Sequence, residues 1–320
     1  MRISGLGFVI GGVSGASLVA LRCVGVVKIA IIAAVVSLTV KISLNWILIF
    51  GNLGAPAMEI EGAATASVVS RIVEFTIVSV YVFKIDNKIK FRLRYFLISN
   101  AVLLRDCARH GGPVFINELL WGLGAATIAI IIGQMGTEFT AANSITVSLG
   151  HFVSIVGFSM GFAAAALIGN TVGAGEYDKA RIYGSTITII SIIIGVVSCL
   201  LMLVLKYPVL SLYNVSEQTL AYAGYFINIH AVIVIFQCIV MAVLVGLQRG
   251  GGDTRFAMVV DVIFMWAISI PVSFVGGLKL GWAAPLVYFI LRGDEILKTI
   301  VSLLRIRSGK WIKNITQTEA

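Results

Sequence analysis

Apolar runs of about 20 residues recur along the whole chain, and they restrict its fold more than any other feature. A helix of that length crosses a hydrocarbon core of roughly 30 Å. Because lipid offers the backbone no hydrogen-bond partners, a crossing segment must pair its own N–H and C=O groups, as a helix does. The sequence therefore predicts an all-α integral membrane protein with about nine transmembrane helices. The expected spans are residues 3–21, 29–50, 63–83, 113–135, 143–168, 182–205, 219–246, 256–278 and 281–304.

The composition argues against a soluble domain and against an enzyme. Hydrophobic residues make up 59% of the chain and charged residues 12%, whereas soluble domains carry about 25% charged residues. The four cysteines form no CxxC pair and have no zinc spacing with the three histidines. No Ser-His-Asp order or HExxH motif occurs, and the glycine run at 250–252 lacks the Lys-Ser or Lys-Thr of a phosphate loop. We expect a tight turn there, with Asp253 capping the next helix, and neither a metal site nor a cofactor.

The basic residues indicate the orientation of the chain. With the C-terminus placed inside, eighteen basic residues fall on inside segments and three on outside segments. This asymmetry is the one that cytoplasmic loops show, so we expect a multi-pass protein of the plasma membrane with a cytoplasmic C-terminus. No basic stripe alternates with aromatic residues, which argues against nucleic acid as a partner of this chain of net charge +9. The inside residues include Arg22, Lys28, Lys179, Arg181, Arg249, Arg255 and Lys298.

Two segments have alternative interpretations. The first run could be a signal peptide, but it is rich in Gly and Ser and has no convincing small-x-small cleavage site, so we interpret it as a span. The stretch from Lys84 to Gly112 holds seven basic residues among apolar positions such as Phe91 and Leu97. That pattern is typical of a helix lying in the membrane interface, and this stretch also separates the spans into two groups.

An internal repeat relates the two groups of spans. Residues 20–28 and 247–255 align when Arg22 is placed on Arg249, and both stretches link two apolar spans. Parallel repeats are a transporter architecture. The second half begins near Arg105, so Arg249 lies about 140 residues into that half. The aligned Arg22 lies only about 20 residues from the start of the sequence. A symmetric parent would have about twelve spans, six per half, and about three appear absent from the front of this chain.

Five motifs occur in a fixed order along the sequence. They are NWILIFG at 45–51, EGAATA at 61–66, GTEFTAANSI at 136–145, GNTVGAGEYDKA at 169–180 and RGGGDTR at 249–255. In order and spacing they resemble helices four to twelve of multidrug and toxic compound extrusion (MATE) transporters. The resemblance covers nearly the whole chain.

The resemblance implies an incomplete two-lobe (6+6) bundle around a central cavity. Residues 1–95 would form a partial N-terminal lobe, equivalent to helices 4–6 with a cytoplasmic linker, and residues 96–320 the C-terminal lobe, equivalent to helices 7–12. The family exports organic, often cationic, compounds in exchange for Na⁺ or H⁺. We accordingly expect a monomer in the lipid bilayer with small organic substrates. Several family members carry an ion-coupling Asp in the first helix, which cannot be present here.

Ionisable and polar groups inside a membrane cost several kcal/mol and are candidates for function. The candidates for ion coupling or for the substrate cavity are Glu118, Asp261, His230, Lys41, Asn143 and Gln237.

The carboxylates each have a functional and a structural interpretation. Glu118 could hold a cation or a proton, or it could pair with Arg109 or with the helix dipole. Sodium-coupled relatives place a Glu about one turn later, where this chain has Trp121. Asp261 could line the cavity or pair with a loop base such as Arg255. The residues that we interpret as a structural ion-pair network are Arg292, Asp294 and Glu295.

The remaining candidates are neutral or basic. His230 lies deep in its span and can exchange a proton near neutral pH, although a hydrogen-bonded structural histidine is an alternative. The resemblance would place an acidic ion ligand near Gln237 or Cys238, and neither is acidic. Lys41 lies near the middle of the second span, where it could pair across the cavity or extend toward the interface. Asn143 offers an amide ligand or a helix cap.

The sequence and the resemblance leave three functions open. The first is a secondary antiporter that exports organic compounds or drugs, driven by ion or proton binding to a membrane carboxylate. The second is a lipid-linked oligosaccharide flippase of the same superfamily, which should have a more cationic cavity to hold pyrophosphate. The third is a truncated fragment that does not transport.

Overall fold

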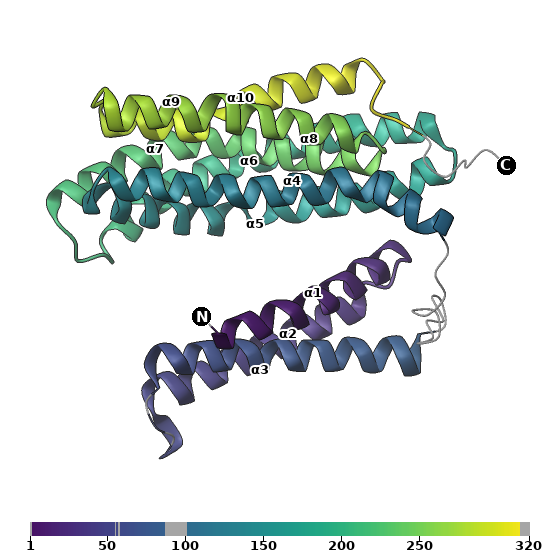
Figure 1. Cartoon of the computed structure of the whole chain (residues 1–320), viewed down its shortest axis with the longest axis horizontal. Helices are drawn as coiled ribbons and strands as arrows, with labels where there is room; N and C mark the ends of the chain where they lie inside the picture. The colour runs from purple at the N-terminus through teal and green to yellow at the C-terminus, as the bar shows by residue number, and fades with distance from the viewer. Residues whose placement is uncertain (1, 55, 57, 87–100, 314–320) are drawn as a thin grey trace. The chain divides into compact units, whose positions relative to one another are not determined.

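The chain forms two units that are helical in every described element. The structure, a computed structural model, describes all residues except 1, 55, 57, 87–100 and 314–320. The units are Met1–Asn100 and Ala101–Ala320, drawn in purple to blue and in blue to yellow in Figure 1. In the described part of the chain the one extended contact is an isolated bridge between Gly252 and Ile312.

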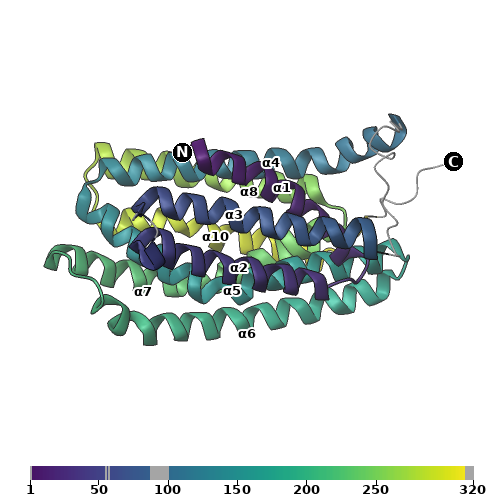
Figure 2. The ribbon, with the colours of Figure 1, turned by 90° about the horizontal axis from the view of Figure 1, so that it is seen from below.

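The first unit contains three long helices. They are α1 (Arg2–Cys23), α2 (Lys28–Phe50) and α3 (Glu59–Val80), with a 3₁₀ turn at Asn52–Gly54 and a π-helical turn at Tyr81–Ile85. The helix α3 packs against both α1 and α2 and lies between them in Figure 2. Gly62 makes this packing close, because a Cβ at that position would lie 2.7 Å from the Leu48 carbonyl oxygen.

The second unit is a bundle built around α7. Its elements are α4 (Ala101–Gln134), α5 (Thr137–Gly173), α6 (Tyr177–Leu210), α7 (Glu217–Val240) with η4 (Met241–Gln248), α8 (Thr254–Ile263), η5 (Phe264–Ser269), α9 (Ile270–Phe274), η6 (Val275–Lys279) and α10 (Ala284–Arg307). The helix α7 contacts α5, α6 and α10. Together α7 and η4 form the continuous helical segment Glu217–Gln248. It is the most deeply buried candidate span, with 61% of its most apolar stretch inside the protein.

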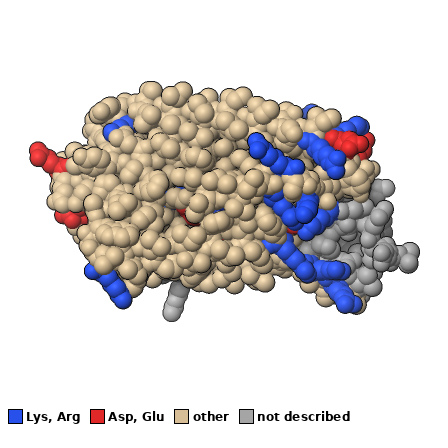
Figure 3. All heavy atoms as spheres, turned by 90° about the horizontal axis from the view of Figure 1, so that it is seen from above, with Lys and Arg blue, Asp and Glu red and all other residues tan. Residues whose placement is uncertain are grey.

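These helices confirm the all-α membrane fold that the apolar runs predict. Within the described residues seven helices are long and apolar enough to cross a membrane, and Gly7–Cys23 is a shorter apolar helix. The helix α10 covers the last expected span but carries charged residues in its middle, among them Asp294 and Lys298. On the face drawn in Figure 3, the Lys and Arg side chains gather toward the end of the bundle at which α10 finishes.

Two local expectations differ from the structure. Residues 87–100 of the expected interfacial helix lie outside the described residues, but from Ala101 onward its chain is the first part of α4, which continues through Pro113. Asp253 is the N-cap residue of α8 but makes no capping hydrogen bond. Its buried carboxylate instead pairs with Arg305 and Lys313, because two cations from the C-terminal part of the chain reach it.

Glycines let α5 pack closely against η4, which continues α7. A Cβ at Gly161 would lie 2.6 Å from the Met241 carbonyl oxygen, and one at Gly246 would lie 2.7 Å from the Cβ of Ala164. Small residues at such interfaces allow the close backbone packing that holds membrane helices together.

Replacing Gly161 with alanine should therefore destabilise the second unit by about 1–3 kcal/mol, because the added methyl group forces the two backbones apart. Thermal denaturation in detergent, followed by circular dichroism, measures this loss. The control is Gly173→Ala at the end of the same helix, where a Cβ would meet nothing within 4 Å. An equal loss at both positions would show that the close approach to Met241 does not set the effect, since alanine is the better helix former at either position.

Candidate ion-binding site

A buried group of charges joins three helices of the second unit. We call Asn117, Asp261, Asp294, Glu295 and Lys298 the charge cluster. The Lys298 ammonium nitrogen lies 2.6 Å from Oδ1 of Asp261 and 2.7 Å from Oδ2 of Asp294. Asn117 Nδ2 donates a hydrogen bond of 3.1 Å to the second oxygen of Asp261. The Lys298 side chain is only 2% exposed, so its charge is balanced by these carboxylates and not by water.

Local structure explains how these side chains meet. Asp294 and Lys298 are four residues apart on α10, so they lie on one face of that helix. Asp261 lies in α8. The helical turn η5, which continues α8, is held to α4 and α10 by two hydrogen bonds. Trp266 Nε1 donates to the Leu120 carbonyl oxygen of α4 at 3.1 Å, and Ser269 Oγ donates to the Ile290 carbonyl oxygen of α10 at 3.1 Å.

Two buried polar atoms of the charge cluster have no hydrogen-bond partner among the described residues. They are Oδ1 of Asn117, on the amide that binds Asp261, and Oε2 of Glu295. Burying a polar atom without a partner costs about 1–3 kcal/mol. A cavity of about 100 Å³ lies beside Glu295, and its lining also includes Trp121, Met265, Arg292, Asp294 and Lys298. The free acceptors and the cavity together indicate space for a bound species.

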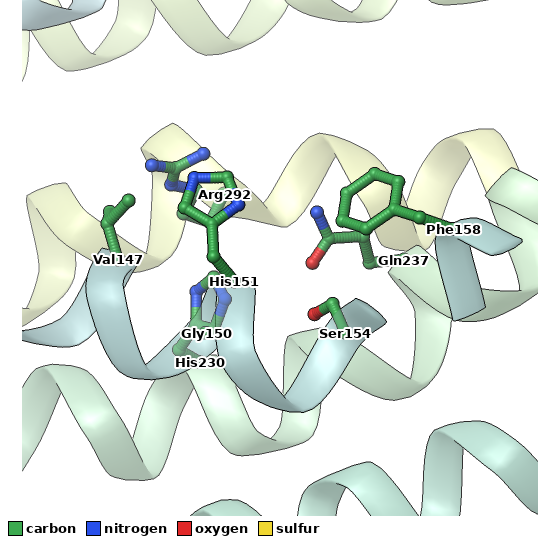
Figure 4. Close-up of a pocket in the computed structure, with 8 residues that line it drawn as sticks. All are labelled: Val147, Gly150, His151, Ser154, Phe158, His230, Gln237 and Arg292. Atoms are coloured by element: carbon green, nitrogen blue, oxygen red, sulfur yellow. The ribbon is translucent and has the colours of Figure 1, made fainter. Parts of the chain in front are cut away.

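A second, smaller pocket adjoins the same arginine. It measures about 40 Å³ and is lined by residues of α5, α7 and α10 (Figure 4). His230 Nδ1 lies 3.1 Å from the Tyr288 hydroxyl, and its Nε2 faces Gly150, where a Cβ would lie only 2.7 Å away. Gln237 Oε1 is buried and has no hydrogen-bond partner in the described part of the chain. Arg292 lines both this pocket and the larger cavity.

The structure brings three of the expected site residues to the charge cluster or to the smaller pocket. Asp261 is in the charge cluster, where its cationic partner is Lys298 and not Arg255. His230 and Gln237 line the smaller pocket. The hydrogen bond to Tyr288 agrees with the structural interpretation of His230.

Glu118 lies apart from the charge cluster. Its carboxylate is 58% exposed and pairs with Arg249 at 2.7 Å, whereas the sequence suggested Arg109 as the partner. Successive helical residues point about 100° apart, since a turn contains 3.6 residues. In α4 it is therefore the preceding residue, Asn117, that reaches Asp261.

Asn143 and Lys41 lie elsewhere. Asn143 is inside α5, whose N-cap is Gly136, so it caps no helix; its side-chain oxygen is buried without a hydrogen-bond partner among the described residues. Lys41 belongs to the first unit, where it lines a groove of about 870 Å³ together with Arg22, Arg71 and Glu74.

Sequence reasoning missed part of the charge cluster. Asn117 was not a candidate, and we expected Lys298 at the cytoplasmic end of its span. Asp294 and Glu295 were interpreted as structural. The available signal was the four-residue spacing of Asp294 and Lys298 within an apolar helix, which predicts an ion pair on one helix face.

Comparison with known proteins identifies the family of this chain. The family model MatE matches residues 113–275, which is just over half of the chain. The chain belongs to the MatE family. This membership confirms the predicted resemblance. The matched region contains Asn117 and Asp261 but ends before α10, so the remaining members of the charge cluster lie beyond it.

Individual relatives agree with this assignment. The MatE chain is 26% identical over 260 residues to the probable multidrug resistance protein YoeA of Bacillus subtilis, covering 80% of this chain and 55% of that protein. It is 26% identical over 281 residues to the probable multidrug resistance protein NorM of Thermotoga maritima, covering 87% and 59%. It therefore spans between half and two thirds of the length of these relatives. Their names are those of resistance proteins, not of enzymes.

Solved structures agree on the fold. The bent form of the Vibrio cholerae MATE transporter VcmN matches the chain with a TM-score of 0.77 at 16% identity, covering 96% of this chain and 69% of that one. At this identity the likeness concerns the fold alone.

Proposed function

We propose that this chain is part of a secondary transporter of the plasma membrane that exports organic, often cationic, compounds in exchange for Na⁺ or H⁺. It would act as a monomer with its C-terminus in the cytoplasm and without a cofactor beyond the coupling ion. The observation that carries the proposal is the charge cluster, in which Asp261, Asp294 and Lys298 form two ion pairs inside the helical bundle.

Buried charges of this kind need a reason to persist. A single ion pair taken out of water is often no more stable than an apolar replacement. In membrane proteins such groups mark ion pathways and proton relays. A cation or proton that binds one conformation of the bundle better than another shifts the equilibrium between them, and this shift is what couples an ion gradient to export. The names of the MatE relatives, which are multidrug resistance proteins, support a drug-like substrate.

Replacing Asp261 with asparagine should reduce export by about 5- to 150-fold, because coupling free energies are typically about 1–3 kcal/mol and correspond to this range. The amide has the size of the carboxylate but cannot balance Lys298 or exchange a proton. The assay measures drug accumulation in cells that lack their own pumps, with membrane expression of each variant quantified.

The matched control is Asp178→Asn, because the Asp178 side chain is 98% exposed at the start of α6. It should export as the wild type does. Export by Asp261→Asn at the wild-type rate would remove the charge cluster from the coupling mechanism. Absence of export by the wild-type chain, with all variants in the membrane, would instead favour a fragment that does not transport.

A second function is favoured by the groove of the first unit. Its lining includes the cations Arg22, Lys41 and Arg71 but only one acid, Glu74, which pairs with Arg71 at 2.9 Å. A cationic groove suits the pyrophosphate of a lipid-linked oligosaccharide. A flippase would transport such a lipid, would lose this transport in a Lys41→Gln variant, and would export no drug in either form. An antiporter would instead export drugs and would transport no such lipid.

A further inference from the structure

We propose that the charge cluster is a proton-binding site and that Glu295 is the residue that carries the proton. Its part in transport rests on the proposed function, but proton binding itself does not. Neither the family match, which ends at residue 275, nor the sequence motifs point to this residue.

The first argument is a count of charges around Glu295. Three carboxylates meet here, those of Asp261, Asp294 and Glu295, and the cations that face Glu295 are Lys298 and Arg292. The helix α4 contributes only the neutral amide of Asn117, and α7 contributes the thiol of Cys238. One negative charge is therefore left over inside the bundle. A proton on one carboxyl group neutralises it and removes a cost of several kcal/mol.

Arg292 is itself shared with a second set of groups. On its other side it faces His151 of α5 and His230 of α7, and the Tyr288 side chain lies beside it. The charged groups that act on Glu295 are Lys298, Arg292, Asp261 and Asp294, and neither histidine is among them. The leftover charge therefore remains in the charge cluster.

The second argument identifies which carboxyl group takes the proton. Asp261 binds Lys298 and Asn117, and Asp294 binds Lys298. In contrast, Oε2 of Glu295 is shielded from solvent and has no hydrogen-bond partner in the described structure. Protonating either aspartate would weaken one of the two close ion pairs of Lys298, whereas Glu295 belongs to neither pair.

The third argument concerns the nature of the ligand. Asn117 is 1% exposed, and its free oxygen sits on the amide that binds Asp261, so the site offers a hydrogen-bond acceptor as well as a carboxylate. A hard metal cation needs several oxygens converging on one point. Here Lys298 already occupies the point between two carboxylates, and no group of three or more metal-binding side chains converges within the described residues. A proton needs no such cage.

The cavity gives the proton a path. Its volume of about 100 Å³ borders Glu295 and Lys298, and a buried water needs only about 10–15 Å³ of such space. Water in this cavity would contact Glu295 and also Arg292, which lines the smaller pocket as well.

Carbodiimide labelling tests the proposal without a transport assay. Dicyclohexylcarbodiimide modifies carboxyl groups that are protonated in apolar surroundings. The purified chain of 320 residues is treated in detergent between pH 5.5 and 9, and modified peptides are quantified by mass spectrometry. We expect modification at Glu295 and a loss of about tenfold per pH unit once the carboxyl group titrates. Glu118, which is exposed and paired with Arg249, serves as the internal control and should remain unlabelled.

A Glu295→Gln variant separates this inference from the proposed function. It should lose labelling and, in export measured with imposed gradients, lose the response to pH. Labelling of Glu295 with no export by the wild type would support the proton site while defeating the transporter. Absence of labelling at every pH, or a Glu295→Gln variant that retains export driven by a proton gradient, would overturn the proton site.

Discussion

Replacing Lys298 with methionine is expected to destabilise the second unit by about 3–5 kcal/mol, the usual cost of removing one partner of a buried ion pair. Methionine fills similar volume, so the loss is electrostatic. Asp261 and Asp294 would face each other across the vacated position, where Lys298 Nζ now lies 2.6 and 2.7 Å from them. Thermal denaturation in detergent, followed by circular dichroism, gives the change in stability against the wild type.

Neutralising the partners tests the same explanation. A Lys298→Met, Asp261→Asn, Asp294→Asn variant removes the charges together and should recover most of the lost stability, since whole buried ion pairs can often be replaced without cost. Lys310→Met, at an exposed position near the end of the chain, controls for the loss of a surface lysine and should melt with the wild type. If Lys298→Met also melted with the wild type, water would have to reach the two aspartates.

The apolar runs predicted the fold because hydropathy alone decides which segments cross a membrane. The same signal says little about α10, whose middle contains Asp294, Glu295 and Lys298. Only the packing of α10 against α8 and η5 shows that Lys298 pairs with Asp261 as well as with Asp294. A one-dimensional count of basic residues instead placed Lys298 at the cytoplasmic end.

Asp261 is the one member of the charge cluster that the sequence identified as a site candidate. Asp261 was a candidate because a carboxylate in a span is costly wherever it points. For α4 the same reasoning selected Glu118, yet its neighbour Asn117 faces the cluster. The facing side of a helix depends on contacts with other helices, and a neutral amide gives no warning in the sequence. Tertiary structure was therefore needed to identify it.

The C-terminal hook, residues 308–313, offers the second large effect. Trp311 is 1% exposed and packs with Ala180, Ile187 and Leu247. The backbone N–H of Lys313 donates to the Gly251 carbonyl oxygen at 2.7 Å. The hook thus holds α6 and the end of η4 together at one end of the bundle.

Replacing Trp311 with alanine should cost about 3–5 kcal/mol, because the removed ring leaves a cavity that the surrounding helices cannot fill. The measurement is again thermal denaturation in detergent. The adjacent Lys310 is exposed, so Lys310→Ala is the control for the hook itself and should change stability by less than about 0.5 kcal/mol.

Gly251 provides an independent test of this packing. A Cβ at Gly251 would lie 2.6 Å from Cε3 of Trp311 and 2.8 Å from its carbonyl oxygen, so Gly251→Ala alone should cost about 1–3 kcal/mol through overpacking. In the double variant the ring is gone and the new methyl group meets it no longer. The two losses should therefore sum to more than the loss of the double variant, by about 0.5–3 kcal/mol. Strict additivity would mean that the ring and the glycine act on stability separately, and that the hook is held by its backbone bond and by Asp253 instead.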